Sequence, residues 1–205
     1  MPSLNTKAPP KALYALVLGA GAGSRFGGGK LLAPWRGGTV LEAALEAAFA
    51  APVEAVLLTA GADGEVEGAA RAWAGRAGEA ARLSILDVPD WREGMAASLR
   101  AGVVALPLDA GGLYVFLGDM PRVPIAVLPA LAKALAEGAP AAVPTFDGRR
   151  GHPALIGAGL FGEVAKLSGD RGAKGLLDAL GAALAEVAAP DNGALFDVDT
   201  PADLD

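Results

Sequence analysis

The sequence predicts an α/β protein in which a mostly parallel sheet lies between two layers of helices. Two observations favour this fold. Short, uninterrupted apolar runs recur along the 205 residues, and the longer segments between them carry apolar residues at helical spacing. Such runs are typical of parallel strands that are buried on both faces, and alternation of strands with helices builds sheets of this kind. We therefore expect a single-domain, three-layer sandwich.

The expected strands share this apolar character and lie at 13–18, 55–59, 83–86, 113–117 and 141–143. After position 143 the pattern changes to a turn rich in glycine and arginine, a short run at 153–156, helical segments near 160–166 and 173–180, and a last run at 196–198. We expect this tail to add strands at the edge of the sheet and to form a wall for a second substrate.

Several segments between the strands predict helices. The alanine-rich segment 41–51 has a high helix propensity. Two further segments carry apolar stripes that predict buried helix faces. The stripes consist of Met95, Leu99, Gly102, Val103 and Leu106, and of Ile125, Leu128, Leu131 and Leu135.

Composition and charge limit the possible functions. The formal net charge of −6 argues against nucleic acid or an anionic membrane as a partner. The chain has no cysteine and one histidine, so a metal would be held mainly by carboxylates, which favours Mg²⁺ over zinc. Residues 1–10 show no periodicity and end in two prolines, which predicts a flexible arm before a domain at 11–205. The apolar run at 12–18 is short for a signal peptide and far too short for a membrane span, so we expect a cytoplasmic protein.

The most informative segment is the glycine-rich stretch 16–32, LVLGAGAGSRFGGGKLL, directly after the first expected strand. Glycines let backbone N–H groups approach phosphate oxygens, so this loop favours phosphate binding. Its spacing excludes two common phosphate loops. In the dinucleotide pattern G-x-G-x-x-G, the last position falls on Ser24 when counted from Gly19 and on Phe26 when counted from Gly21. In the P-loop pattern, the first glycine position falls on Ser24.

Acidic residues stand at two further places of interest in the sequence, after the expected strand at 113–117 and near the C-terminus. Asp119 comes two residues after the expected strand at 113–117, at its carboxyl end, where open α/β sheets bind their ligands. By position alone, it fits a metal ligand and the cap of a helix near Pro124 equally well. Near the C-terminus, Thr200-Pro201 with Asp203 is typical of a helix start, in which Asp203 supports the cap.

The glycine-rich loop, the segment around Asp119 and the C-terminal segment resemble motifs of the MobA-like nucleotidyltransferases, and they occur in the same order along the chain. Residues 18–30 resemble the family pattern L-A-[AG]-G-x-S-x-R-x-G-x-x-K, although the serine and arginine are shifted by one position, the spacing before Lys30 is compressed, and Gly19 replaces the usual alanine. The stretch LGDMP at 117–121 resembles L-x-D-x-P. The stretch DVDTPAD at 197–203 resembles D-[IV]-D-T-P-x-D.

Three further segments resemble the same family. Residues 89–102 are similar to N-P-x-W-x-x-G-[ML]-x-x-S-[LI]-x-x-G, with Val88 in place of the asparagine and Ala97 where a second serine is frequent. GRRGHP at 148–153 resembles G-x-x-G-H-P, and GDRGAK at 169–174 resembles G-D-x-G-[AL]-[RK]. The resemblance thus extends over nearly the whole chain, and it implies the Rossmann-like sheet of the nucleotide-diphospho-sugar transferases.

The resemblance also implies a set of site residues. Arg25, Lys30 and Asp119 would be catalytic, and the positive side chains of Arg25 and Lys30 would bind the triphosphate. Mg²⁺ would lie on Asp119 and Asp199, with Asp197 as the substitute for Asp199. The nucleotide would contact Leu18, Gly19, Ala20, Gly21, Gly23, Ser24, Arg25, Lys30, Gly94, Ser98 and Asp119.

On the acceptor side, the resemblance implies Arg150, His152, Arg171 and Lys174. A histidine in a G-H-P turn fits a hydrogen-bonded structural residue better than a proton-transfer group. Trp91 fits packing better than stacking on a base.

Ala20, at the third position of the loop motif, resembles the cytidylyltransferase branch of the family, which acts on the molybdenum cofactor. This implies CTP and the molybdopterin cofactor as substrates, and a recipient molybdoenzyme as a further partner. An acceptor phosphate that is already ionised near pH 7 needs no general base. Guanylyl transfer, a sugar-phosphate or polyol-phosphate acceptor, and a non-catalytic carrier or chaperone of the molybdenum cofactor remain as alternatives.

Overall fold

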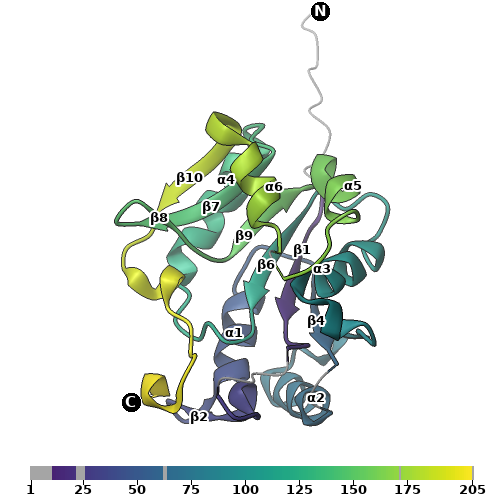
Figure 1. The fold of residues 1–205 in the computed structure, drawn as a ribbon, viewed down its shortest axis with the longest axis vertical. Helices are drawn as coiled ribbons and strands as arrows, with labels where there is room; N and C mark the ends of the chain where they lie inside the picture. The colour runs from purple at the N-terminus through teal and green to yellow at the C-terminus, as the bar shows by residue number, and fades with distance from the viewer. Residues whose placement is uncertain (1–10, 22–25, 62–63, 171, 205) are drawn as a thin grey trace, which may run out of the picture.

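The structure, a computed structural model, describes residues 11–21, 26–61, 64–170 and 172–204. Its centre is an eight-stranded sheet in the order β10-β7-β9-β6-β1-β4-β5, with the short β8 paired to β7 (Figure 1). The strands are β1 (Leu13–Leu18), β4 (Ala55–Ala60), β5 (Leu83–Asp87), β6 (Gly112–Leu117), β7 (Ala141–Phe146), β8 (Arg149–Arg150), β9 (Ala154–Gly157) and β10 (Leu184–Ala188). All five strands expected from the apolar runs are confirmed.

Most of the strand pairs are parallel. Strands β6, β1, β4 and β5 run in one direction, and β10 is parallel to β7. The prediction that the tail adds strands at the edge is confirmed for β10, which is the last strand of the sheet. It was wrong for β9, which lies inside the sheet, antiparallel to both β6 and β7. The run at 196–198 is also not a strand. Instead, the backbone N–H of Val198 donates to the carbonyl of Asp119 at 2.9 Å, outside the sheet.

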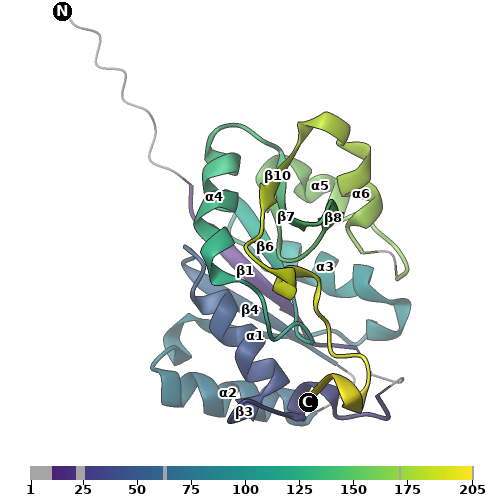
Figure 2. The same ribbon diagram turned by 90° about the vertical axis from the view of Figure 1, so that its left-hand side faces the viewer.

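Alternation along β1 produces the three layers, because successive side chains of a strand point to opposite faces. Ala15 and Val17 pack with helices α1, α2 and α4, whereas Tyr14 and Leu16 pack with α3, α5 and α6. Figure 2 shows the two helix layers on either side of the strands. The helices are α1 (Val40–Phe49), α2 (Glu65–Ala77), α3 (Met95–Val104), α4 (Leu128–Ala136), α5 (Phe161–Val164) and α6 (Lys174–Ala179).

The two predicted apolar stripes are buried only in part. Leu99 and Gly102 of α3 are buried against the sheet, and a Cβ atom on Gly102 would overlap the side chain of Leu16. Met95 is 36% exposed because it begins α3 at the mouth of a pocket, and Ile125 is 58% exposed because it lies in a 3₁₀ turn before α4. Both were wrongly predicted as core.

Two short strands outside the main sheet, β2 (Pro34–Trp35) and β3 (Gly38–Thr39), form a hairpin before α1. Thr39 and Glu42 then form a capping box, in which each side chain accepts the backbone N–H of the other. Across the described ranges, no helix is long and apolar enough to cross a membrane. The predicted arm at 1–10 lies outside these ranges.

Candidate active site

The glycine loop leaves the sheet where β1, β4 and β6 end together. The N–H of Gly118 donates to the carbonyl of Leu18 at 3.0 Å, and the N–H of Gly19 donates to the carbonyl of Thr59 at 3.1 Å. A Cβ atom on Gly19 would lie only 2.8 Å from that carbonyl oxygen. The close contact with β4 therefore favours glycine at this position of the chain.

Lys30 begins a 3₁₀ turn (Lys30–Leu32) behind three glycines with positive φ angles, Gly27, Gly28 and Gly29. Its ammonium lies 2.6 Å from Oδ2 of Asp119 and 3.3 Å from Oδ1 of Asp199. Burial lowers the pKa of Lys30, but the hydrogen bonds and negative charges of the two carboxylates outweigh this effect and raise it. Lys30 therefore stays charged, and it joins two motifs that are far apart in the sequence.

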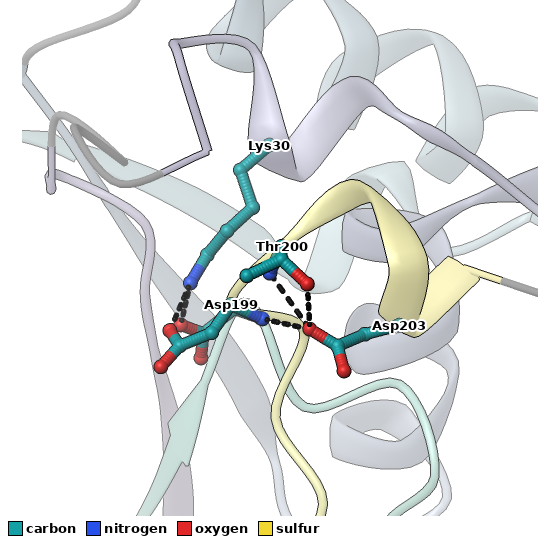
Figure 3. A network of polar contacts seen from close by, with 5 residues as sticks. Lys30, Asp199, Thr200 and Asp203 are labelled. Atoms are coloured by element: carbon teal, nitrogen blue, oxygen red, sulfur yellow. Dashed lines mark hydrogen bonds and ion pairs between the residues drawn. The ribbon is translucent and has the colours of Figure 1, made fainter.

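The C-terminal segment is shaped so that Asp199 faces Lys30, as Figure 3 shows. Oδ2 of Asp203 accepts from the N–H of Asp199 at 3.1 Å, and from the N–H and the hydroxyl of Thr200 at 2.7 and 2.9 Å. The hydrogen bonds from Thr200 also lower the pKa of Asp203. Asp203 thus stabilises the turn at Pro201–Leu204, while the carboxylate of Asp199 points to the lysine.

The carboxylates of Asp119 and Asp199 suit a divalent cation that substrate and water also coordinate better than a cation held by protein side chains alone. In the described residues, no three His, Asp or Glu side chains gather closely enough to hold a metal by themselves. Asp119 and Asp199 nevertheless converge on one positive charge, the ammonium of Lys30. Mg²⁺ commonly takes one or two protein carboxylates and completes its shell with water and substrate phosphates. Partial desolvation and the charges of Asp199 and Asp119 raise the pKa of Asp197, which therefore lies in the field of the same acidic group.

A pocket of about 430 Å³ opens beside Asp119. It is bounded by the glycine loop, the end of β6, the first turn of α3 and the segment before α6. Six of the predicted nucleotide residues lie around it, whereas Gly23, Ser24 and Arg25 are outside the described residues. The lining residues are Leu18, Ala20, Gly21, Trp91, Arg92, Gly94, Met95, Ser98, Leu117, Asp119 and Asp170.

The family of this chain is decided by a match over nearly its whole length. Residues 15–201 match the MobA-like NTP transferase domain. The chain belongs to the MobA-like NTP transferase family. It is therefore a nucleotidyltransferase, with the α/β fold of that family.

Three relatives resemble this MobA-like transferase in sequence. It is 32% identical over 200 residues to the purine catabolism protein PucB of Bacillus subtilis, with 94% of each chain covered. It is 35% identical over 168 residues to nicotine blue oxidoreductase of Paenarthrobacter nicotinovorans, with 78% of each covered. It is 27% identical over 147 residues to molybdenum cofactor cytidylyltransferase of Escherichia coli, with 71% of this chain and 70% of the relative covered.

Solved structures support the same fold. The crystal structure of Rv0371c from Mycobacterium tuberculosis has a TM-score of 0.76 and 32% identity, with 95% of this chain and 96% of that chain covered. A structure of Rv0371c in complex with manganese has a TM-score of 0.67 and 28% identity, with 96% and 94% covered.

One wall of the MobA-like pocket is apolar. Ala20 is 2% exposed and packs with Val88 and Ala97, and Trp91 lies against this cluster. Val88, which takes the place of the asparagine in the motif that this segment resembles, is buried in this cluster. Trp91 packs as predicted, but it also lines the pocket, and the guanidinium of Arg92 lies 4.3 Å from the centre of its ring.

The residues predicted for the acceptor lie elsewhere. Arg150 is held in ion pairs by Glu186 at 2.7 Å and Asp178 at 3.0 Å. His152 is partly buried, its backbone N–H donates to the carbonyl of Ala194 at 2.8 Å, and its ring Nδ1 lies 3.5 Å from the carbonyl oxygen of Val115. Burial lowers the pKa of its ring, which favours the neutral form. Lys174 is exposed at the start of α6. Of the residues that the structure describes, these three do not line the 430 Å³ pocket, and Arg171 falls outside them.

The pocket also contains residues that were not predicted as site residues: Arg92, Met95, Leu117 and Asp170. Asp170 belongs to the stretch GDRGAK, in which only Arg171 and Lys174 were predicted as site residues. An acidic residue in that stretch was visible in the sequence, but its position against α3 depends on tertiary contacts.

Proposed function

We propose that this MobA-like transferase moves CMP from CTP to the phosphate of the molybdopterin cofactor and releases pyrophosphate, with Mg²⁺ as cofactor. The observation that carries the proposal is the group formed by Lys30, Asp119 and Asp199 beside the pocket. A cation between two carboxylates suits the binding of a triphosphate with its metal, and Asp119 lies beyond the carboxyl end of β6, where open α/β sheets bind their ligands.

In the proposed reaction, an oxygen of the acceptor phosphate attacks the α-phosphorus of CTP. The bond between the α-phosphorus and the oxygen leading to the β-phosphorus breaks, and pyrophosphate leaves with that electron pair. Because the attacking oxygen is already ionised, no residue has to remove a proton. Catalysis then depends on positioning and on neutralising phosphate charge.

The residues of this chain would divide that work. Lys30 and Arg25 would neutralise the triphosphate, together with the N–H groups of the glycine loop. Asp119 and Asp199 would hold Mg²⁺, which when bound offsets negative charge on the phosphate oxygens. Since Lys30 contacts both carboxylates, binding of the metal would shift its ammonium from them towards the phosphates.

Two findings favour cytidylyl transfer within the family. Ala20 supplies a methyl group where a guanylyltransferase would have glycine, and it forms part of the pocket wall. One relative is named as a molybdenum cofactor cytidylyltransferase. The manganese complex of Rv0371c supports a divalent metal. A further relative is named as an oxidoreductase, but the glycine spacing of this chain does not fit the dinucleotide pattern.

The test is pyrophosphate release from each of the four NTPs, with the molybdopterin cofactor or with sugar phosphates as acceptor. We expect release with CTP and the molybdopterin cofactor. Release only with a sugar phosphate would reassign the acceptor. Tight binding of CTP without any pyrophosphate would instead indicate a carrier.

A further inference from the structure

Asp170 lies in the pocket on a loop that is fixed to α3. The N–H of Ala96 donates to the carbonyl of Gly169 at 3.1 Å, and the guanidinium of Arg100 donates to the carbonyl of Leu167 at 2.8 Å. Arg100 is held in turn by Glu93 at 2.7 Å. The backbone on the N-terminal side of Asp170 is therefore anchored to the helix that forms one wall of the pocket.

Gly94 leaves room for the carboxylate of Asp170. Its φ angle is +99°, and a Cβ atom at this position would overlap Oδ1 of Asp170 and approach the carbonyl carbon of Gly169 to 2.8 Å. The carboxylate thus rests against the backbone at the start of α3. Any other residue at position 94 would push it away.

This carboxylate has no structural partner that accounts for it. Within the described ranges, it takes part in no hydrogen bond or ion pair. It also does not cap α3, because the N–H of Ala96 donates to Gly169 and that of Ala97 donates to Gly94. Asp170 is therefore available to a ligand in the pocket.

We propose that Asp170 accepts a hydrogen bond from a ribose hydroxyl of the bound nucleoside triphosphate and so selects ribonucleotides over deoxyribonucleotides. The inference rests on the proposed function, which places a nucleotide in this pocket. An ionised carboxylate only accepts hydrogen bonds, so it pairs with hydroxyl or amine donors and repels phosphate. The phosphates belong beside Lys30 and Asp119, and the apolar wall of Ala20 and Trp91 suits the base. This arrangement leaves the ribose of the nucleotide next to Asp170. A carboxylate that accepts a hydrogen bond from a ribose hydroxyl is well known in nucleotide-binding folds.

The experiment compares wild type with Asp170→Ala. Binding of the four NTPs and of their 2′-deoxy and 3′-deoxy analogues is measured by calorimetry, and turnover is measured for the best NTP. Losing a hydrogen bond to a charged group typically weakens binding by about 10- to 100-fold. We expect the variant to bind the ribonucleotide more weakly by that factor and to bind one deoxy analogue as the wild type does.

Glu163→Ala serves as the matched control, because Glu163 is an exposed carboxylate on α5 that pairs only with Lys166 among the described residues. Three outcomes would overturn the assignment. The wild type could bind ribonucleotides and deoxynucleotides equally, or Asp170→Ala could weaken the binding of both by the same factor. Asp170→Ala could also lose the selectivity for the base while it keeps the selectivity for the ribose. If the wild type bound no NTP at all, the proposed function would fail as well.

Discussion

Replacing Lys30 by methionine removes a positive charge from between two carboxylates while keeping most of the side-chain volume. The lysine side chain is 12% exposed, and those of Asp119 and Asp199 are 26% and 44% exposed. The burial of these ion pairs is therefore intermediate. Exposed ion pairs contribute up to about 1 kcal/mol, and disruption of buried pairs costs about 3–5 kcal/mol. We expect Lys30→Met to lower the free energy of unfolding by roughly 1–3 kcal/mol, because the carboxylates then repel each other without compensation.

The assay is thermal unfolding with and without MgCl₂, together with pyrophosphate release. Each kcal/mol corresponds to a change in Tm of about 2–4 °C for a chain of this size. Mg²⁺ at ten times its Kd would return about 1.4 kcal/mol if it binds between the same carboxylates, so the variant should gain more from Mg²⁺ than the wild type. Turnover should fall strongly even where stability is restored.

Lys166→Met is the matched control, because its ion pair with Glu163 is exposed on both sides. It should change the free energy of unfolding by less than about 0.5 kcal/mol. An unaltered Tm of Lys30→Met, or a loss that Mg²⁺ does not reduce, would refute the idea that the lysine occupies the cation position between Asp119 and Asp199.

Two further predictions concern selectivity and pH. Wild type should use CTP better than GTP by roughly 10- to 200-fold, and Ala20→Gly should narrow this ratio; equal kcat/KM values for both nucleotides in wild type would contradict the cytidylyl assignment. Burial lowers the pKa of His152 in the folded protein and outweighs the hydrogen bond with the Val115 carbonyl and the charges of Asp119 and Asp197. The unfolded chain therefore binds a proton first as the pH falls through about 6.5. The contribution of the neutral His152 to the free energy of unfolding should be fully present above that pH, and it should decrease below that pH by up to about 1.4 kcal/mol per pH unit. Urea unfolding between pH 5 and 8 should therefore show a shallower acid decline for His152→Asn, and identical slopes would contradict this.

The positions of the main strands along the chain could be predicted because each strand is an apolar run, as is typical of strands that are buried on both faces. The insertion of β9 between β6 and β7 could not, since strand order depends on long-range pairing and not on local pattern. The burial of Met95 and Ile125 was overestimated because periodicity alone does not show where a helix begins.

The candidate site was predictable where chemistry is concentrated in short motifs. The resemblance of two short motifs to those of the family implied that Asp119 and Asp199 lie close together, and the structure brings both to Lys30. Asp170 was missed because its position depends on Gly94 and on the anchoring of its loop to α3, neither of which a sequence pattern expresses. Arg150 is a plausible anion ligand by residue type, but its charge is already balanced by Glu186 and Asp178.

The proposed metal site is tested most directly by a titration of pyrophosphate release against Mg²⁺ for wild type, Asp119→Asn, Asp199→Asn and the double variant. If both carboxylates hold one metal, each single variant should lose most activity and need more Mg²⁺ for what remains. The double variant should be little worse, because residues that act as a unit are not additive. Asp197→Asn provides the comparison with a neighbouring carboxylate and should leave the Mg²⁺ curve nearly unchanged. A wild-type Mg²⁺ curve for Asp119→Asn would contradict the proposed metal site and the mechanism that depends on it.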